Sequence, residues 1–315
     1  RITAQLIDAS TGNHIWAQNY DRELEDIFAV QDEITQTVVG RIEPEVGAVE
    51  RQRVKGKQPH SLDAWDCYHL GLAQFYKFSE EGNAEAQRLF RRSIELDPEF
   101  AGPYSWLAYA MVLSMVYFDA DPRSEALDEA LRYARKAVEI DDQDAMTHLV
   151  AGRVHLARRE YDLALSEAQI SMELNPCHAH PYCALGDSLA YEGRLEESIS
   201  QFETAIRLSP HDPFRWAFYS YRALAHLFLG QFEAAVEWAR RAVSTPNCQY
   251  WANAHLVSAL GHLGRSDEAR AAKQALLQRV PDFSCDFAKR KLFYIRRPEQ
   301  MNIYLEGLRK AGLPE

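Results

Sequence analysis

Four side chains that commonly bind metals lie within seven residues, in the run Cys177-His178-Ala179-His180-Pro181-Tyr182-Cys183. Thiolate and imidazole are preferred ligands of Zn²⁺, so a zinc site is the first chemistry to consider. The spacing matches none of the usual paired-cysteine frameworks, however. Cys177 and His178 fall in an expected turn, whereas His180 and Cys183 are three residues apart on the next expected helix. We therefore expect ordinary turn and groove residues here and no bound metal.

Common catalytic motifs are absent from the sequence. It contains no Walker-type glycine loop, no Gly-x-Ser-x-Gly and no His-Glu-x-x-His. His148, His155 and His226 occupy positions that suit packing, and we expect them in or near the core. Acidic residues such as Asp162 stand at expected helix starts, where they favour the helix dipole. The sequence therefore predicts a protein that is not an enzyme and needs no cofactor.

Composition narrows the possible partners. The 315 residues are 47% hydrophobic and 26% charged, with 35 Lys and Arg against 46 Asp and Glu, a net charge of -11. No basic cluster is longer than Arg51 to Lys57, which argues against a nucleic-acid surface. Five scattered cysteines fit a reducing compartment, so we expect a cytoplasmic protein. The longest nearly apolar stretch, 104–118, is shorter than the roughly 18 to 20 residues of a membrane span and predicts a buried helix.

A repeat organises most of the chain. A short acidic or polar mark, usually followed by proline, recurs at Asp97-Pro98, Asp141-Asp142, Asn175-Pro176 and Ser209-Pro210. The steps from 142 to 176 and from 176 to 210 are both 34 residues. Between the marks, apolar residues follow two helical patterns, with small residues near their middles. The sequence therefore predicts stacked helix pairs.

These features resemble the tetratricopeptide repeat. The fourth unit matches its pattern with Tyr182, Leu185, Gly186, Leu189, Gly193, Ser198, Phe202, Ala205 and Pro210. Six such units cover residues 63–281. The resemblance implies an all-α solenoid, a right-handed superhelix of helix pairs, in which small residues allow close helix contact and large ones fill gaps between units.

Residues 282–315 are expected to cap this array. Met301, Tyr304, Leu305 and Leu308 form one apolar stripe on a helical pattern, while Glu299, Glu306, Arg309 and Lys310 fall on the other side. Gly312 is then placed to end the helix.

The first residues follow a different period. Alternating apolar residues and the turn residue Gly12 predict a β-hairpin over 1–22. An apolar stripe with helical spacing then predicts a long linker helix over 23–57, kinked at Pro44. A two-stranded hairpin is marginally stable alone, so we expect it to be the end of a truncated α/β domain. Its open edge also motivates a homodimer through the hairpin and the helix.

The stretches 1–12, 16–22 and 26–34 are similar to the end of a small α/β domain related to the TolB amino-terminal domain. The ending from Tyr304 to Pro314 is similar to the tail of bacterial class III adenylate/guanylate cyclase-linked repeat proteins. This resemblance implies a parent protein with a cyclase domain, or sometimes a winged-helix DNA-binding domain, upstream. The paired metal-binding aspartates of such a cyclase cannot be assigned to any motif in this chain.

Function is expected on the concave surface of the array, lined by one face of each first helix. Aromatic side chains with few charges suit protein binding there. By the repeat register, the partner-binding groove comprises Trp65, Tyr68, Tyr76, Tyr109, Arg153, His180, Asp187, Tyr191, Ser220, Trp251 and His262. We expect Arg153 and Asp187 to be its polar anchors. An alternative for each groove residue is that it packs against the C-terminal segment or a neighbouring repeat.

The sequence therefore predicts a regulatory, protein-binding module of a larger bacterial signalling protein. Its expected partner is a protein or peptide, such as another domain of the same protein, and neither nucleic acid nor membrane. One alternative is the ligand-sensing region of a transcription regulator, and another is the regulatory part of a nucleotide cyclase.

Overall fold

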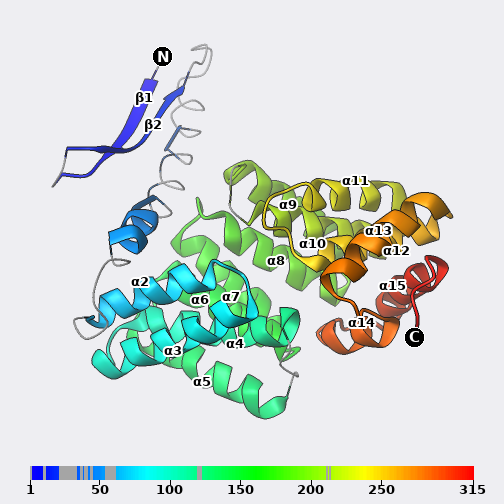
Figure 1. The fold of residues 1–315 in the computed structure, drawn as a ribbon. Helices are drawn as coiled ribbons and strands as arrows, with labels where there is room; N and C mark the ends of the chain where they lie inside the picture. Colours follow the sequence, from blue (N-terminus) through cyan, green and yellow to red (C-terminus); the bar gives the residue numbers. More distant parts are fainter. Residues whose placement is uncertain are drawn as a thin grey trace.

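The structure is a computed structural model that describes residues 2–9, 12–20, 34–35, 38, 42, 45–53, 62–118, 123–210, 212 and 214–315. Among these residues, two strands precede a series of helices (Figure 1). The strands are β1 (Ile2–Ile7) and β2 (His14–Tyr20). The helices with described bounds are α2 (Ala64–Phe75), α3 (Glu80–Leu96), α4 (Ala101–Tyr117), α5 (Ser124–Ile140), α6 (Ala145–Ala157), α7 (Tyr161–Leu174), α8 (Ala179–Glu192), α9 (Leu195–Leu208), α10 (Arg215–Phe228), α11 (Phe232–Val243), α12 (Tyr250–His262), α13 (Ser266–Arg279), α14 (Cys285–Lys291) and α15 (Pro298–Lys310).

The N-terminal hairpin is present as predicted. β1 and β2 pair in antiparallel fashion, with Ile2 opposite Tyr20 and a register irregularity after Leu6. Gly12 takes a φ of 72° in the connection, a conformation that favours glycine. Residues 45–53 are helical. Most of the predicted linker helix over 23–57, including Pro44 and its expected kink, lies outside the described residues.

In the described part of the chain, α2 to α13 form six consecutive helix pairs, from α2–α3 to α12–α13. Two of these pairs share the same close contact. Gly71 of α2 faces Phe90 of α3, and Gly186 of α8 faces Phe202 of α9; an added Cβ would lie 2.5 Å and 2.7 Å from the respective rings. Both phenylalanines are fully buried. The predicted role of small residues in bringing the helices together is confirmed, because any larger side chain would push the rings away.

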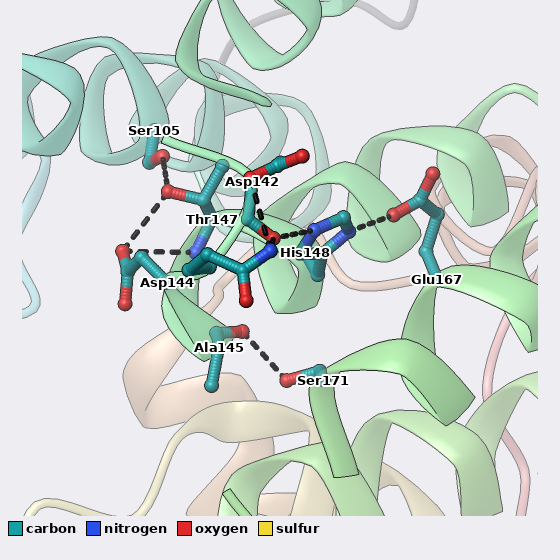
Figure 2. Close-up of polar contacts among 9 residues, drawn as sticks. Ser105, Asp142, Asp144, Ala145, Thr147, His148, Glu167 and Ser171 are labelled. Atoms are coloured by element: carbon teal, nitrogen blue, oxygen red, sulfur yellow. Dashed lines mark hydrogen bonds and ion pairs between the residues drawn. The ribbon is translucent and has the colours of Figure 1, made fainter. Parts of the chain in front are cut away.

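A side-chain cap fixes the start of α6 (Figure 2). The carboxylate of Asp144 accepts hydrogen bonds from the backbone N–H of Met146 at 3.1 Å and of Thr147 at 3.2 Å. The hydroxyl of Thr147 also donates to Asp144 at 2.9 Å and lies 3.2 Å from the hydroxyl of Ser105 in α4. A local cap thus also links two neighbouring repeats.

In two of the helix pairs, a serine hydroxyl near the end of the second helix donates a hydrogen bond to the first residue of the first helix. Ser171 of α7 donates to the carbonyl of Ala145 at 2.6 Å, as Figure 2 shows. Ser93 of α3 makes the same bond to Ala64 at 2.6 Å in the first repeat. Both acceptors are first residues of their helices. The recurrence of this contact supports the repeat register that the sequence predicts.

The apolar stretch 104–118 forms α4 and its C-cap, and most side chains of α4 are buried, as predicted. Within the described residues, no helix combines the length and the apolar character needed to cross a membrane.

The C-terminal helix α15, predicted to be part of a polar cap at the end of the array, packs against the last repeat. It packs mainly on α12 and also on α10, on the side lined by the first helix of each pair (Figure 1). We call this side the inner surface. The outward positions of α13, such as Arg270, Gln274 and Gln278, are exposed and polar. The last repeat therefore ends the array with a face that tolerates water.

The array also closes on itself across the inner surface. From α12, the hydroxyl of Tyr250 and the indole N–H of Trp251 donate to the carbonyl of Val116 in α4, at 3.2 Å and 3.3 Å. Lys291 of α14 is buried and donates to the carbonyl of Phe118 at 2.5 Å. The second repeat is thus in direct contact with the sixth repeat and with α14.

Candidate functional site

The inner surface of the first repeat carries three of the predicted groove residues. Trp65 and Tyr76 remain exposed, at 45% and 37%, and Tyr68 is half-buried. The Trp65 ring stacks on Phe100 with centroids 5.8 Å apart and meets Tyr68 at 6.1 Å. Tyr76 approaches Phe214, which precedes α10, at 5.5 Å. These side chains form an accessible aromatic patch, which we call the N-terminal patch.

Residues 45–53 lie against the N-terminal patch. The indole N–H of Trp65 donates to the carboxylate of Glu50 at 3.2 Å, and the guanidinium of Arg51 lies 4.8 Å from the ring centre of Tyr76. Burial raises the pKa of Glu50, but the hydrogen bonds from Trp65 and Arg53 and the charge of Arg53 outweigh it, so the net pKa is lowered. The patch is therefore already in contact with the chain that leads into the array.

The predicted polar anchors are bonded to each other. Arg153 of α6 forms an ion pair with Asp187 of α8, whose side chain is 2% exposed. The second carboxylate oxygen of Asp187, Oδ1, is buried without a hydrogen-bond partner among the described residues. Arg153 keeps 13% of its side-chain surface, so it is the accessible member of the pair. In this arrangement Asp187 orients Arg153, and the side chain of Asp187 is too buried to contact a binding protein.

Tyrosines surround this pair. Tyr109, a predicted groove residue, is half-buried, and burial raises its pKa. Tyr221 lies with its ring centre 6.0 Å from the Arg153 guanidinium, and burial raises its pKa to about 12. The hydroxyls of Tyr117 and Tyr221 are 3.2 Å apart. All of these phenols are neutral at physiological pH, so they offer hydrogen bonds and no negative charge to Arg153.

Sequence reasoning missed Tyr117, Tyr221 and Tyr294 at this site. Tyr221 follows the predicted Ser220 directly, so a wider face of α10 in the register would have included it. Tyr117 is the last residue of α4, the helix that also carries Tyr109. Tyr294 comes from the segment between α14 and α15, outside the repeats, and no repeat position predicts it.

Of the four candidate zinc ligands, His178 and His180 lie with ring centroids 5.2 Å apart, whereas His180 and Cys183 have different polar partners. The imidazole of His180 pairs with Asp212 at 3.2 Å and packs on Phe218 at 5.5 Å. Burial raises the pKa of Asp212, but the charge and hydrogen bond of His180 outweigh it, so the net pKa is lowered. Cys183 faces Arg153 instead, and burial raises its pKa to about 11. No group of three metal-ligating side chains comes together within the described ranges.

The histidines expected in packing positions are held by structural hydrogen bonds. His148 bridges Glu167 at 2.7 Å and the carbonyl of Asp142 at 3.0 Å (Figure 2). His155 and His226 make matching contacts at the ends of their helices, to Glu160 at 2.6 Å and to Gln231 at 2.7 Å. Each of these two acceptors lies five residues after its histidine, at the turn into the next helix. These imidazoles hold turns in place.

The remaining predicted groove residues are covered by the C-terminal segment or buried among helices. Tyr191 is 2% exposed and packs on Tyr294 with ring centroids 4.8 Å apart. Trp251 is 3% exposed and lies against Phe283 at 5.7 Å. His262 bonds to the carbonyl of Ile303, and Ser220 of α10 is buried. The alternative that the sequence left open, packing against the C-terminal segment, describes Tyr191, Trp251 and His262.

Comparison with known sequences gives partial matches. Residues 183–249 match the family model of the tetratricopeptide repeat. A stretch of 148 residues is 34% identical to a protein of Rhizobium meliloti (strain 1021) with the provisional name adenylate cyclase 3, over 47% of this chain and 25% of that protein. A stretch of 101 residues is 31% identical to protein O-mannosyl-transferase Tmtc1 of Drosophila melanogaster, over 31% of this chain and 12% of that protein. The chain therefore spans a quarter or less of the length of these curated relatives.

Solved structures share the fold at low sequence identity. A chain of the APC/C hetero-tetramer Cut9-Hcn1 aligns with a TM-score of 0.61 and 16% identity, over 82% of this chain and 48% of that one. A tetratricopeptide repeat protein from Parabacteroides merdae ATCC 43184 aligns at 0.53 and 11% identity, over 89% and 98%. A thermophilic protein of the same repeat class from Thermus thermophilus aligns at 0.52 and 17%, over 62% and 98%. Together with the recurring repeat contacts, these matches show that the helical part of the chain has the helix-pair solenoid fold of tetratricopeptide repeat proteins, with residues 183–249 matching the repeat family itself.

Proposed function

We propose that this chain is a non-catalytic, protein-binding module that regulates a larger bacterial signalling protein in the cytoplasm. One observation carries the proposal: the inner surface of a tetratricopeptide array presents an exposed aromatic patch, with Trp65 45% and Tyr76 37% accessible. Exposed aromatics that lie together supply large contact areas with polar tips, as protein-binding hot spots do. Tetratricopeptide arrays present such surfaces to protein or peptide partners.

The accessible part of the predicted groove defines the proposed site. It comprises the N-terminal patch, the half-buried Tyr109, the accessible face of Arg153 and the imidazole of His180, which is 29% exposed. Asp187, Tyr191, Ser220 and Trp251 would support this surface from below. An internal peptide segment or a folded domain fits it better than a C-terminal carboxylate, because Arg153 is the one lysine or arginine among the predicted groove residues.

The partner that we favour is a catalytic domain of the same protein. The similarity to a protein named as an adenylate cyclase supports a cyclase-linked parent over a transcription regulator. The coding sequence upstream of Arg1 would distinguish the two: class III cyclase motifs favour our proposal, whereas a winged helix supports the alternative.

Binding of the separately produced upstream region to this chain tests the site. We expect Trp65→Ala and Tyr76→Ala each to weaken binding about tenfold or more in titration calorimetry, as loss of a hot spot does. Val243→Ala is the matched control, because Val243 is equally exposed, at 37%, but ends the outer helix α11. Unchanged binding in both aromatic variants would remove the N-terminal patch from the site.

Homodimerisation through the N-terminal hairpin is a second element of the proposal. Ile2 and Ile7 of β1 are 45% and 47% exposed, and the hairpin is the one sheet among the described residues. Two copies could pair their strand edges and cover these side chains. Light scattering should give twice the monomer mass, and Ile7→Lys should restore the monomer. A monomeric wild type at working concentration would count against the dimer.

A further inference from the structure

The inner side of α12 holds α15 through hydrogen bonds to its backbone and to the hydroxyl of Tyr304. The hydroxyl of Ser258 donates to the carbonyl of Tyr304 at 2.8 Å, and Nε2 of His262 lies 2.7 Å from the carbonyl of Ile303. Nδ1 of His255 meets the hydroxyl of Tyr304 at 2.9 Å. Three residues of one helix face, at positions 255, 258 and 262, thus all bind the same segment. Such side-chain contacts to a backbone are how a groove holds a peptide.

Small residues allow a very close approach of the two helices. Gly261 of α12 and Gly307 of α15 face each other, and a Cβ added to either would clash with the backbone of the opposite helix. On Gly307, the clash would be with the carbonyl and hydroxyl of Ser258. The surface of α12 therefore accepts a helix in this position only when that helix carries a glycine opposite Gly261.

Residues 294–300, which lead into α15 and form its first turn, are also held by hydrogen bonds to repeat helices. The hydroxyl of Tyr161 in α7 donates to the carbonyl of Tyr294 at 2.5 Å. In return, the side chains of Arg297 and Gln300 donate to the carbonyls of Glu192 and Ala190 at the end of α8, at 2.5 Å and 2.7 Å. Residues 294–310 therefore contact the third and fourth repeats as well as the sixth.

The segment is amphipathic in the way of a bound helix. Tyr304, Leu305 and Leu308 are buried on the array, whereas Glu299, Asn302, Glu306, Arg309 and Lys310 are exposed. α13 already ends the array with a polar face, so stacking of the repeats does not require α15 at that end. Removing α15 would uncover an apolar surface on α10 and α12 that contains Gly261.

We propose that this surface of α10 and α12 is a helix-binding site, that α15 is its resident ligand, and that a protein partner occupies it by displacing α15. The partner presents a helix of the same chemistry: a glycine opposite Gly261, a tyrosine three positions earlier that reaches His255, and a leucine directly after the glycine. The inference deepens the proposed protein-binding function and rests on it, since it names the kind of segment that a partner would carry.

A labelled peptide with the sequence of residues 296–315 tests the proposal on the full chain. In the wild type, the docked α15 lowers the apparent affinity of the peptide by the fraction of molecules in which the site is open. In Gly307→Leu, α15 cannot seat while every residue of α10 and α12 is unchanged. We expect fluorescence anisotropy to show at least about tenfold tighter peptide binding by this variant than by the wild type. The same peptide carrying Gly307→Leu is the matched control and should not bind.

A second variant protects the test against a folding defect of the first. Asn302 is on the exposed face of α15, so Asn302→Pro breaks that helix without touching the binding surface. It should also gain peptide binding, with the circular dichroism of the array preserved. Loss of the whole fold in both variants, or no gain of peptide binding in either, would overturn the proposal.

The outcome is separable from that of the proposed function. If Trp65→Ala and Tyr76→Ala leave binding of the upstream region unchanged while the Gly307→Leu variant binds the peptide, the N-terminal patch fails and the helix-binding surface stands. The reverse pattern would retain the patch and reject the surface.

Discussion

The first and sixth repeats present side chains at matching repeat positions on the inner surface. These side chains are exposed in the first repeat and covered in the sixth. In the first repeat, Trp65 and Tyr76 are open to solvent beside residues 45–53. In the sixth, Trp251 and His262 are covered by α14, α15 and the residues around them. The difference comes from the C-terminal segment, which folds back on one end of the array. Repeat position thus determines which side chains line a groove, while the chain beyond the repeats determines which of them a partner meets.

The largest expected effect is at the junction between the two ends. Asp187→Ala would leave Arg153 in its enclosed site without a partner, so we expect a loss of about 3–5 kcal/mol in the free energy of unfolding, measured with urea. Asp267→Ala is the control, because its ion pair with Arg270 is on the surface and should contribute nothing measurable. Equal effects of both substitutions would mean that Asp187 does not stabilise a buried charge on Arg153.

Acid should loosen the C-terminal end through His255. Burial lowers the pKa of this imidazole to about 3, from an ordinary value of 6.5. The unfolded chain therefore binds one more proton between these pH values, so the stability from His255 is complete above pH 6.5 and falls as the pH drops toward 3. At pH 5 the loss is about 2 kcal/mol.

Hydrogen exchange of α15 at pH 7 and pH 5 would measure this effect. His255→Gln keeps a side-chain partner for Tyr304 but does not titrate, and it should flatten the pH dependence. An unaltered pH dependence in this variant would assign the effect to other groups.

Tyr304→Phe separates the hydroxyl of α15 from its packing. It leaves His255 Nδ1 buried without its partner, at an expected cost of about 1–2 kcal/mol. The cost should appear as faster exchange in α15, with that of α2 unchanged. A uniform increase along the whole array would show that α15 and the repeats unfold together.

The smallest effect on stability is expected at the open end. Trp65 is half-exposed, so Trp65→Ala should lower the free energy of unfolding by less than about 1 kcal/mol in urea titration. Its effect on binding of the upstream region should be much larger than its effect on stability. A loss of stability as large as that from Asp187→Ala would make Trp65 a core residue and not a contact residue.

The repeat contacts could be predicted from sequence because they are local. The 34-residue step, Gly71 facing Phe90 and Gly186 facing Phe202 all follow from helix geometry within one pair. The burial of the apolar stripe of Tyr304, Leu305 and Leu308 could also be predicted from the helical spacing of these residues. Arg153 and Asp187, one repeat apart, were both expected in the groove.

The closure of the inner surface could not be predicted in the same way. It depends on small rotations that add up over several repeats, so no single unit encodes the meeting of Tyr117 with Tyr221. Tyr294 and α15 lie outside the repeats, and a helical stripe alone does not say which surface it covers. The bond between Arg153 and Asp187 likewise depends on how far α6 and α8 turn toward each other.

The contact of Tyr250 and Trp251 with Val116 has a consequence for how the array unfolds. In an open solenoid each repeat contacts only its neighbours, so the array can unfold progressively from either end. Here two bonds join residues that are 134 and 135 positions apart in sequence. Because these bonds link the second repeat to the sixth, we expect the two repeats to unfold in one cooperative step. We also expect folding to be slower than the local contacts of a helical repeat suggest.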